Sequence, residues 1–347
     1  MLCVTVRQDW QFCAGHHPLT RSLANGLTTV IWATCLWAAF LSAAVTMSAA
    51  EVTAAEPATV VAPGSEKFPL NLQDGDRVVF LGGTLTERDG QFGDLETAIM
   101  LAAPGKHVTF RNLGWSGDTV WADSRGVFDP PAVGYQRLIA LVKELSPSVV
   151  VLMYGQNEAH AGPARLAAFQ QQYRKLCEDL QQAGPTKLVF ALPPLIHRPE
   201  AAYQAWNQQL QTYRGAIAEL ATSPEFVKSR SEFIDLDWNP NPARMADYYE
   251  GPHLTPQGSD AWALELAQTW GTPMSGNSAE VRHRLRAEVV AKNTLFFHRW
   301  RPQNSTYLFG FRKHEQGNNA VDIPKFDELT RAADQQLAVL KSKLLQH

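Results

Sequence analysis

The chain has 347 residues, of which 45% are hydrophobic and 19% charged, and its formal net charge is −3. This composition is typical of a globular protein with one large domain and appendages, or with two domains, and it excludes a disordered or fibrous chain. The nearly balanced charge gives no electrostatic basis for binding nucleic acid or an anionic membrane surface, so neither is predicted as a partner.

The first 50 residues have the layout of an export signal. Residues 24–50 contain no charged side chain, Arg7 and Arg21 precede them, and the small residues 48–50 resemble a signal exit. A retained single-span anchor is the alternative, because the apolar run nearly reaches the length that crosses a bilayer. In both cases the remainder is predicted to be exported, whether periplasmic, extracellular or anchored with its bulk facing outside.

Behind this leader, residues 51–72 lack periodicity and are rich in alanine, proline and valine, which predicts a linker. Short apolar runs then alternate with stretches of helical periodicity. The predicted strands are residues 78–81, 107–111, 148–153, 187–192 and 232–236. The predicted helices are residues 94–103, 132–145, 166–180, 203–220 and 261–270. This alternation predicts a parallel five-stranded sheet with helices on both faces.

Cys177 is the single cysteine that remains once the leader is removed, so no internal disulfide is predicted. It lies on an apolar stripe at helical spacing that includes Tyr173 and Leu180. We therefore predict that Cys177 is a buried packing residue.

Three of the predicted strands end in residues that suit a ligand site. The first runs into Gly82, Gly83 and Thr84, the second into a turn that contains Gly117, and the third into a turn that contains Asn157. Parallel strands joined by right-handed crossovers emerge at one edge of the sheet, where open α/β sheets hold ligands. The three turns are therefore predicted to converge.

A hydroxyl, an imidazole and a carboxylate are the parts of a nucleophilic hydrolase triad, and Thr84, His253 and Glu250 supply one of each. A histidine exchanges protons near neutral pH, and a carboxylate behind it fixes its tautomer. Structural alternatives stay open at this stage. They are a helix start or turn for Thr84, a buried structural histidine for His253, and turn formation for Asn157 and Gly117.

Two further residues compete for these roles. Ser116 follows the second strand, but residues 114–118 lack the final glycine of a G-x-S-x-G elbow, which favours a turn serine. His160 is a candidate base or substrate contact, with a solvent-facing loop histidine as the alternative. No metal-binding constellation and no phosphate-binding glycine loop is recognisable in the sequence, so no cofactor or metal is predicted.

Over about residues 77–270, these motifs resemble those of the SGNH/GDSL hydrolase family of esterases and lipases. The family's Gly-Asp-Ser-Leu motif falls on residues 82–85, its second-motif glycine on Gly117, and its Gly-x-Asn-Asp motif on residues 155–158. Its Asp-x-x-His motif falls on residues 250–253. Among the catalytic positions, Thr84 stands where the family has serine and Glu250 where it has aspartate.

The resemblance implies a flavodoxin-like three-layer α/β/α sandwich over residues 73–272. Together with the predicted export signal, it implies an exported ester hydrolase, either a carbohydrate O-deacetylase or a short-acyl esterase, that acts through an acyl-enzyme on a small-molecule or glycan ester. Thr84 would be the nucleophile, His253 the general base and Glu250 its partner, with Gly117 and Asn157 in the oxyanion hole. The alternative is a catalytically inactive module that binds a glycan or a protein. Membrane contact is expected only through an uncleaved N-terminal segment.

Residues 273–347 break the strand–helix rhythm and are predicted to form a C-terminal extension packed on the hydrolase domain, after a hinge at residues 271–278. Residues 327–345 have the pattern of an amphipathic helix. Residues 293–317 mix aromatic and basic side chains, and most of these aromatics are predicted to be buried against the domain. They are Phe296, Trp300, Tyr307, Phe309 and Phe311. A lid or a sugar-stacking surface is the alternative for this segment.

Overall fold

The computed structural model describes residues 70–184, 187–229, 231–271, 278–315 and 319–345. The predicted leader, nearly all of the predicted linker and most of the predicted hinge lie outside these residues. None of the described helices combines the length and the apolar character that crossing a bilayer requires.

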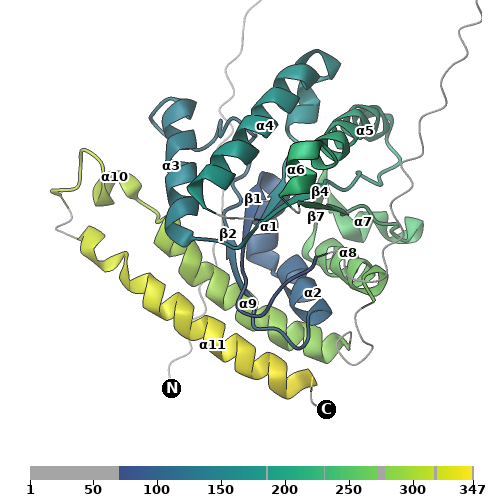
Figure 1. Ribbon diagram of the computed structural model, residues 1–347. Helices are drawn as coiled ribbons and strands as arrows, with labels where there is room; N and C mark the ends of the chain where they lie inside the picture. The colour runs from purple at the N-terminus through teal and green to yellow at the C-terminus, as the bar shows by residue number, and fades with distance from the viewer. Residues whose placement is uncertain (1–69, 185–186, 230, 272–277, 316–318, 346–347) are drawn as a thin grey trace, which may run out of the picture. The chain divides into compact units, whose positions relative to one another are not determined.

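A five-stranded parallel sheet organises the fold (Figure 1). Its strands are β1 (Arg77–Gly82), β2 (Thr109–Asn112), β3 (Val149–Met153), β4 (Lys187–Leu192) and β5 (Glu232–Asp235). They lie in the order β2-β1-β3-β4-β5 and every neighbouring pair is parallel. This is the flavodoxin-like order of doubly wound proteins, so the predicted fold class is confirmed. A short antiparallel pair, β6 (Tyr249–Glu250) and β7 (His253–Leu254), lies apart from this sheet.

Helices connect the strands and continue beyond them. Those of the strand–helix unit are α1 (Thr84–Phe92), α2 (Asp94–Ala102), α3 (Pro131–Leu145), α4 (Leu166–Ala183), α5 (Ala201–Ala221), α6 (Pro224–Lys228), α7 (Met245–Tyr248) and α8 (Pro256–Thr269). The C-terminal helices are α9 (Ala279–Trp300), α10 (Ser305–Leu308) and α11 (Lys325–Leu345). Short 3₁₀ turns occur at Glu158–Ala161, Pro163–Arg165, Pro242–Arg244 and Asn319–Asp322.

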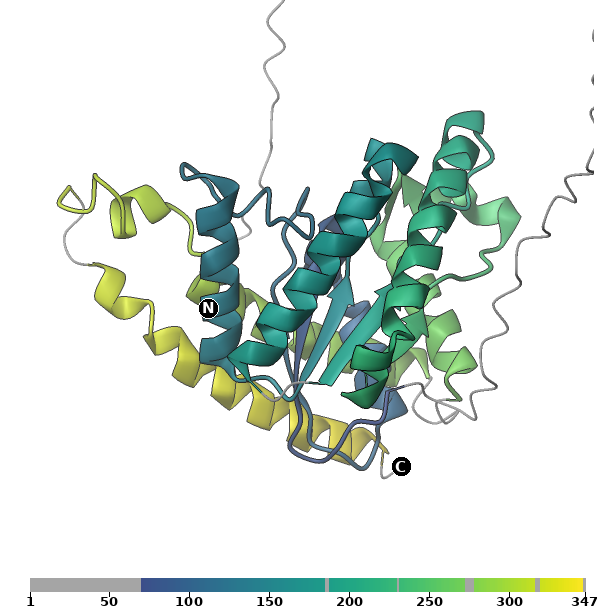
Figure 2. The ribbon, with the colours of Figure 1, turned by 45° about the horizontal axis from the view of Figure 1, so that its top comes forward.

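Two hydrophobic cores cover the two faces of the sheet, because successive side chains of a strand point in opposite directions. Val78 and Phe80 enter one core together with α2, α8 and α9, whereas Val79 and Leu81 enter the other with α3, α4 and α5. Figures 1 and 2 show these helices on their two faces. Cys177 is fully buried in the second core, as predicted.

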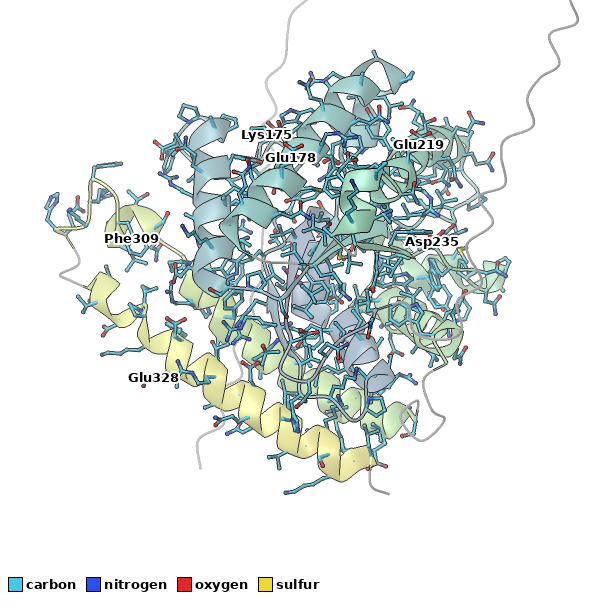
Figure 3. The ribbon with its side chains drawn as sticks, in the orientation of Figure 1. Lys175, Glu178, Glu219, Asp235, Phe309 and Glu328 are labelled. Carbon is cyan, nitrogen blue, oxygen red and sulfur yellow. The ribbon has the colours of Figure 1, made fainter. Side chains whose placement is uncertain are left out.

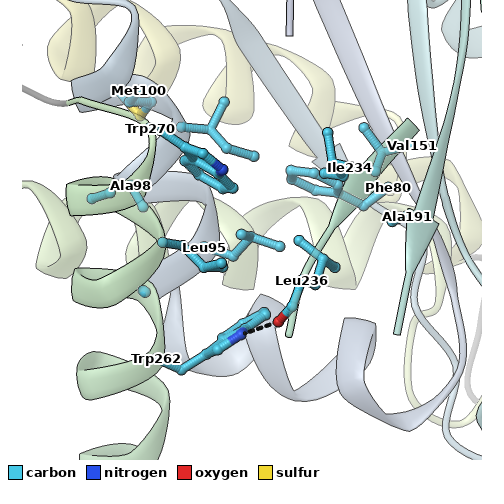
Figure 4. Close-up of a cluster of buried hydrophobic side chains, with 14 of the residues drawn as sticks. Phe80, Leu95, Ala98, Met100, Val151, Ala191, Ile234, Leu236, Trp262 and Trp270 are labelled. Carbon is cyan, nitrogen blue, oxygen red and sulfur yellow. Dashed lines mark hydrogen bonds between the residues drawn. The ribbon is translucent and has the colours of Figure 1, made fainter. Parts of the chain in front are cut away.

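The first core contains a polar anchor. Figure 4 shows Trp262 of α8 beside Leu236, the residue after β5, within a cluster of buried apolar side chains. Its indole nitrogen donates a hydrogen bond to the carbonyl oxygen of Leu236 at 2.8 Å. This bond satisfies a buried donor and fixes α8 against the end of β5.

The structure adds α1, α9 and the short helices α6, α7 and α10 to the predicted helices. It also begins α8 at Pro256, five residues before the predicted start at Ala261. The Thr255 side chain caps this helix, because its hydroxyl accepts the backbone N–H of Gly258 at 3.0 Å.

The C-terminal extension packs on α1, α2 and β2 through α9, and α11 runs along α9 (Figure 1). A fully buried ion pair joins α9 to α2, with Lys292 Nζ 2.6 Å from Glu96 Oε1. A second, nearly buried pair joins α11 to β2, with Arg111 Nη2 2.6 Å from Asp334 Oδ2.

The predicted burial of most aromatics in this extension is wrong. Phe296 is buried, and Trp300 and Tyr307 are half-buried, but Phe309 is 57% and Phe311 80% exposed. Figure 3 shows Phe309 next to α10. Phe309 and Phe311 line a cleft that is open to solvent, together with Phe128 and Trp300, so these two rings stay exposed.

Candidate active site

Thr84 lies at the junction of β1 and α1. β1 ends at Gly82, Gly83 is the N-cap of α1, and Thr84 is the first residue of that helix. The Thr84 hydroxyl therefore does not cap the helix. Instead its Oγ1 accepts the backbone N–H of Gly117 at 3.1 Å. Thr84 is half-exposed and lies at a helix N-terminus, where the helix dipole stabilises negative charge.

The turns after β2 and β3 meet at the same point. Gly117 adopts a φ of 76°, in the left-handed region that glycine tolerates, and its N–H is thereby directed at Thr84. Asn157 Nδ2 donates to the carbonyl oxygen of Asp118 at 2.7 Å. A Cβ on Gly83 would lie 2.5 Å from this same nitrogen, so Asn157 lies directly beside Thr84's neighbour. The predicted convergence of Thr84, Gly117 and Asn157 is what the structure shows.

Glu158, next to Asn157, holds the second and third turns together. Its carboxylate accepts the backbone N–H of Val120 and that of Gly155, each at 2.8 Å. Burial raises the pKa of this carboxyl to about 7, although the two hydrogen bonds lower it. A buried carboxyl satisfied by backbone donors is structural, so Glu158 contributes to the site by fixing its loops.

His253 lies on β7, and its cross-strand partner on β6 is Glu250. Burial lowers the pKa of the His253 ring and the charge of Arg88 lowers it further, while Glu250 raises it. The ring is therefore neutral at pH 7 and able to accept a proton. Among the described residues, neither Thr84 nor Glu250 is hydrogen-bonded to this ring, so the triad stays a prediction.

A narrow cleft with a cavity volume of about 20 Å³ opens beside His253. Leu85 and Gln156, the chain neighbours of Thr84 and Asn157, line it, which brings His253 to the same edge of the sheet. Its apolar walls include Phe92, Ile196, Trp238, Tyr249, Leu254 and Trp262. Small-molecule sites are typically apolar clefts of this kind with a few polar groups, so this cleft is the candidate substrate pocket.

Asp89 lies in the wall of this cleft. It is 3% exposed, and its Oδ1 accepts the backbone N–H of Leu95 at 2.8 Å. Burial raises the pKa of Asp89 from 3.8 to about 8. Asp89 is thus a neutral carboxylic acid at pH 7, in the same cleft as a neutral imidazole.

The pKa of Asp89 predicts an unusual pH dependence of stability. Between about pH 4 and 8 the folded state holds a proton that the unfolded state releases, so the free energy of unfolding decreases as pH rises. The slope from one such proton is about 1.4 kcal/mol per pH unit. Asp89→Asn, which stays neutral and retains an acceptor for Leu95, should lack this contribution. Urea unfolding at pH 5, 6 and 7 measures this contribution. The free energy of unfolding of Asp89→Asn, relative to that of the wild type, should increase as pH rises. A difference in free energy of unfolding that stays constant over this pH range would contradict the prediction.

A second imidazole–carboxylate pair lies at the same edge of the sheet. His197 Nε2 is 2.8 Å from Asp237 Oδ1, and these residues follow β4 and β5. Burial raises the pKa of Asp237, but the hydrogen bond and charge of His197 outweigh this and leave it lowered. The sequence analysis missed this pair, although both residues follow strand ends, the feature that pointed to the first three turns.

The two competing residues do not assemble a site of their own. Ser116 is exposed, and its backbone N–H donates to the Glu87 carboxylate. His160 is exposed and its ring stacks on Trp206, with ring centres 4.3 Å apart. These positions favour a turn role for Ser116 and a loop role for His160.

Comparison with known proteins identifies the family. The model of the GDSL-like lipase/acylhydrolase family matches residues 65–261, which is more than half of the chain. The chain therefore belongs to the GDSL-like lipase/acylhydrolase family. No curated protein matches it.

Several solved structures resemble the chain at low sequence identity. BT4096, a gut microbial diltiazem-metabolizing enzyme, is 14% identical, with 79% of this chain and 95% of that chain covered and a TM-score of 0.43. Est24, a carbohydrate acetylesterase from Sinorhizobium meliloti, is 16% identical, with 56% of this chain and 98% of that chain covered and a TM-score of 0.39. The psychrotrophic esterase EstA from Pseudoalteromonas sp. is 14% identical, with 57% and 100% covered and a TM-score of 0.39.

Proposed function

We propose that this protein is an exported ester hydrolase that removes short acyl groups, acting as a carbohydrate O-deacetylase or a short-acyl esterase. The observation that carries the proposal is the 3.1 Å contact between the Thr84 hydroxyl and the Gly117 N–H, with Asn157 alongside. A nucleophilic hydroxyl and donors for the developing oxyanion are needed at one point for acyl transfer. Membership of the GDSL-like family supports the same class of reaction.

In this mechanism Thr84 Oγ1 attacks the carbonyl carbon of the ester, and His253 takes the hydroxyl proton. The N–H groups of Gly117 and Thr84 and the Nδ2 of Asn157 stabilise the oxyanion of the tetrahedral intermediate. The intermediate collapses by breaking the ester C–O bond, and the leaving alcohol takes the proton from His253. Water then attacks the acyl-enzyme with His253 again as base, which releases the acid and restores Thr84.

The histidine requires a partner that fixes its orientation. Glu250 is exposed and faces His253 across the β6–β7 pair, so a rotation of its side chain would suffice to reach the ring. The neutral ring of His253 suits the role of base near pH 7. The cleft beside His253 is narrow, which suits a short acyl group better than a long one.

The proposal of export rests on the sequence of residues 1–50, with their uncharged run behind two arginines. The substrate would accordingly be a small ester or an acetylated glycan outside the cell. A cleaved signal and a retained anchor are distinguished by the N-terminal sequence of the protein isolated from its source.

A direct test incubates the purified protein with p-nitrophenyl acetate, p-nitrophenyl octanoate and acetylated oligosaccharides. We expect release of acetate, a preference for acetyl over octanoyl, and loss of turnover in His253→Ala. Wild-type protein no faster than His253→Ala on every ester would refute hydrolysis.

The alternative is a module that binds a glycan or a protein through the same cleft without turnover. It is favoured by the absence, among the described residues, of a hydrogen bond between Thr84 and His253. In that case no ester would be hydrolysed, and Thr84→Ala would change ligand affinity by about 1 kcal/mol, the contribution of one hydrogen bond.

Gly83 provides a further prediction about the oxyanion hole. The Cβ of an alanine at this position would lie 2.5 Å from Asn157 Nδ2 and 3.1 Å from the Asp118 carbonyl oxygen, so the Asn157 side chain must move. We expect Gly83→Ala to lower kcat by about 10²–10³-fold, as loss of one oxyanion donor does. Asn157→Ala should lower it as far, and the double variant should be no slower. A double variant whose kcat falls by the product of the two single decreases would contradict this.

A further inference from the structure

The C-terminal extension reaches the candidate site at Arg301, which lies outside the residues matched by the family model. Arg301 directly follows α9, and its Nη1 is 3.1 Å from Glu87 Oε2. Its guanidinium carbon also lies 3.7 Å from the centre of the Trp115 ring. Glu87 is in the first turn of α1 after Thr84, and Trp115 is two residues before Gly117. Both partners of Arg301 thus belong to elements that carry the site.

Glu87 transmits this contact to the loop that holds Gly117. The same Oε2 that pairs with Arg301 also accepts the backbone N–H of Ser116. Ser116 immediately precedes Gly117, whose N–H faces Thr84 Oγ1. The direction of the Gly117 N–H therefore depends on where Glu87 is held. The ion pair is partly shielded, with 27% of the Arg301 side chain and 16% of the Glu87 side chain exposed, so solvent and salt weaken it less than a surface pair.

The other side of this loop is fixed within the matched region. Arg125 Nε pairs with Asp118 Oδ2 at 2.5 Å, and both side chains are buried. Arg125 Nη2 also donates to the Leu113 carbonyl oxygen at 2.7 Å. With this side intact, removing Arg301 should loosen the Glu87 side of the loop without unfolding the domain.

We propose that Arg301 is a positioning residue: from the C-terminal extension, it holds Glu87 and Trp115 so that the Gly117 N–H faces the nucleophile. This proposal rests on the proposed function for its effect on turnover. An oxyanion hole accelerates a reaction because its donors are fixed before charge develops. A donor that samples other directions stabilises the transition state less, whereas binding of the uncharged substrate changes little.

The test compares Arg301→Gln and Arg301→Lys with Arg299→Gln as a matched control. Arg299 lies two residues away and forms ion pairs with Glu144 of α3 at 2.5 Å and Asp327 of α11 at 2.9 Å. Neither partner belongs to α1 or to the turn that contains Gly117. Arg301→Gln should lower kcat by about 10–100-fold with KM within about twofold. Arg301→Lys retains the charge but not the planar stacking on Trp115, so an intermediate kcat is expected. Arg299→Gln should stay within about twofold of wild type.

Hydrogen exchange of the amides at residues 113–119 supplies a readout that does not depend on activity. Arg301→Gln should speed exchange there about tenfold or more, because the Ser116 N–H loses a fixed acceptor, while Arg299→Gln should not. If the wild type hydrolyses no ester, the proposed function fails and exchange alone decides whether Arg301 holds the loop. Arg301→Gln equal to Arg299→Gln in exchange would overturn the proposal, as would a rise in KM at unchanged kcat. If Arg301→Gln does not fold, Arg301→Lys with wild-type kcat and faster exchange would also overturn it.

Discussion

Thr84→Ala and His253→Ala are expected to lower kcat for acetyl esters to the same floor, about 10³-fold or more below the wild type. The two residues act in one step, since the hydroxyl attacks only as the imidazole takes its proton. Removing either therefore removes the whole step, and the double variant should fall little further. Steady-state kinetics of the three variants, with folding checked by circular dichroism, measures this.

Thr84→Ser is the informative companion of these variants. It retains the hydroxyl but removes the methyl group that restricts χ1, and attack on a carbonyl tolerates little misplacement. We therefore expect kcat equal to or above the wild-type value. An active wild type whose Thr84→Ala variant turns over normally would exclude Thr84 as nucleophile. Loss of activity in Ser116→Ala would then identify the exposed serine of the neighbouring turn.

The strands of this protein were predictable because each is a buried apolar run that ends in a turn signal. β4 occurs with the bounds predicted, Lys187–Leu192, and β3 begins one residue later than predicted. Parallel topology then placed three turns together, and the bond from Gly117 to Thr84 bears this out. Here the sequence pattern and the fold follow from the same requirement, burial of both faces of the sheet.

Of the helices that were missed, α1 and α9 have polar residues on their buried sides. α1 buries Thr86 and Asp89, so it shows no apolar periodicity. α9 buries Lys292 and Asn293 between Val289 and Phe296, which interrupts its apolar stripe. Apolar periodicity treats polar residues as exposed. In the folded protein these residues are buried instead, because they contact partners far away in the chain. Arg301 and Glu87 are 214 residues apart in the chain, and no local spacing indicates their contact.

The largest expected effect on stability concerns the ion pair that joins the extension to the domain. Lys292 is 0% and Glu96 2% exposed at the side chain, with 2.6 Å between Nζ and Oε1. Lys292 also donates to the Phe110 carbonyl oxygen, and Asn293 Nδ2 donates to Glu96 Oε2. Lys292→Met would leave a buried carboxylate without its cation, which costs about 3–5 kcal/mol. Urea unfolding should show a loss of this size.

Two comparisons identify the cause of this loss. Arg299→Gln breaks pairs whose carboxylates are about half exposed, so it should cost about 1 kcal/mol or less. Combining Lys292→Met with Glu96→Gln removes the stranded charge yet retains an acceptor for Asn293, so most of the stability should return. If Lys292→Met costs no more than Arg299→Gln, the pair does not hold α9 on the domain. If the double variant stays as unstable as Lys292→Met, the loss comes from packing around the lysine stem, and the buried charge of Glu96 is not its source.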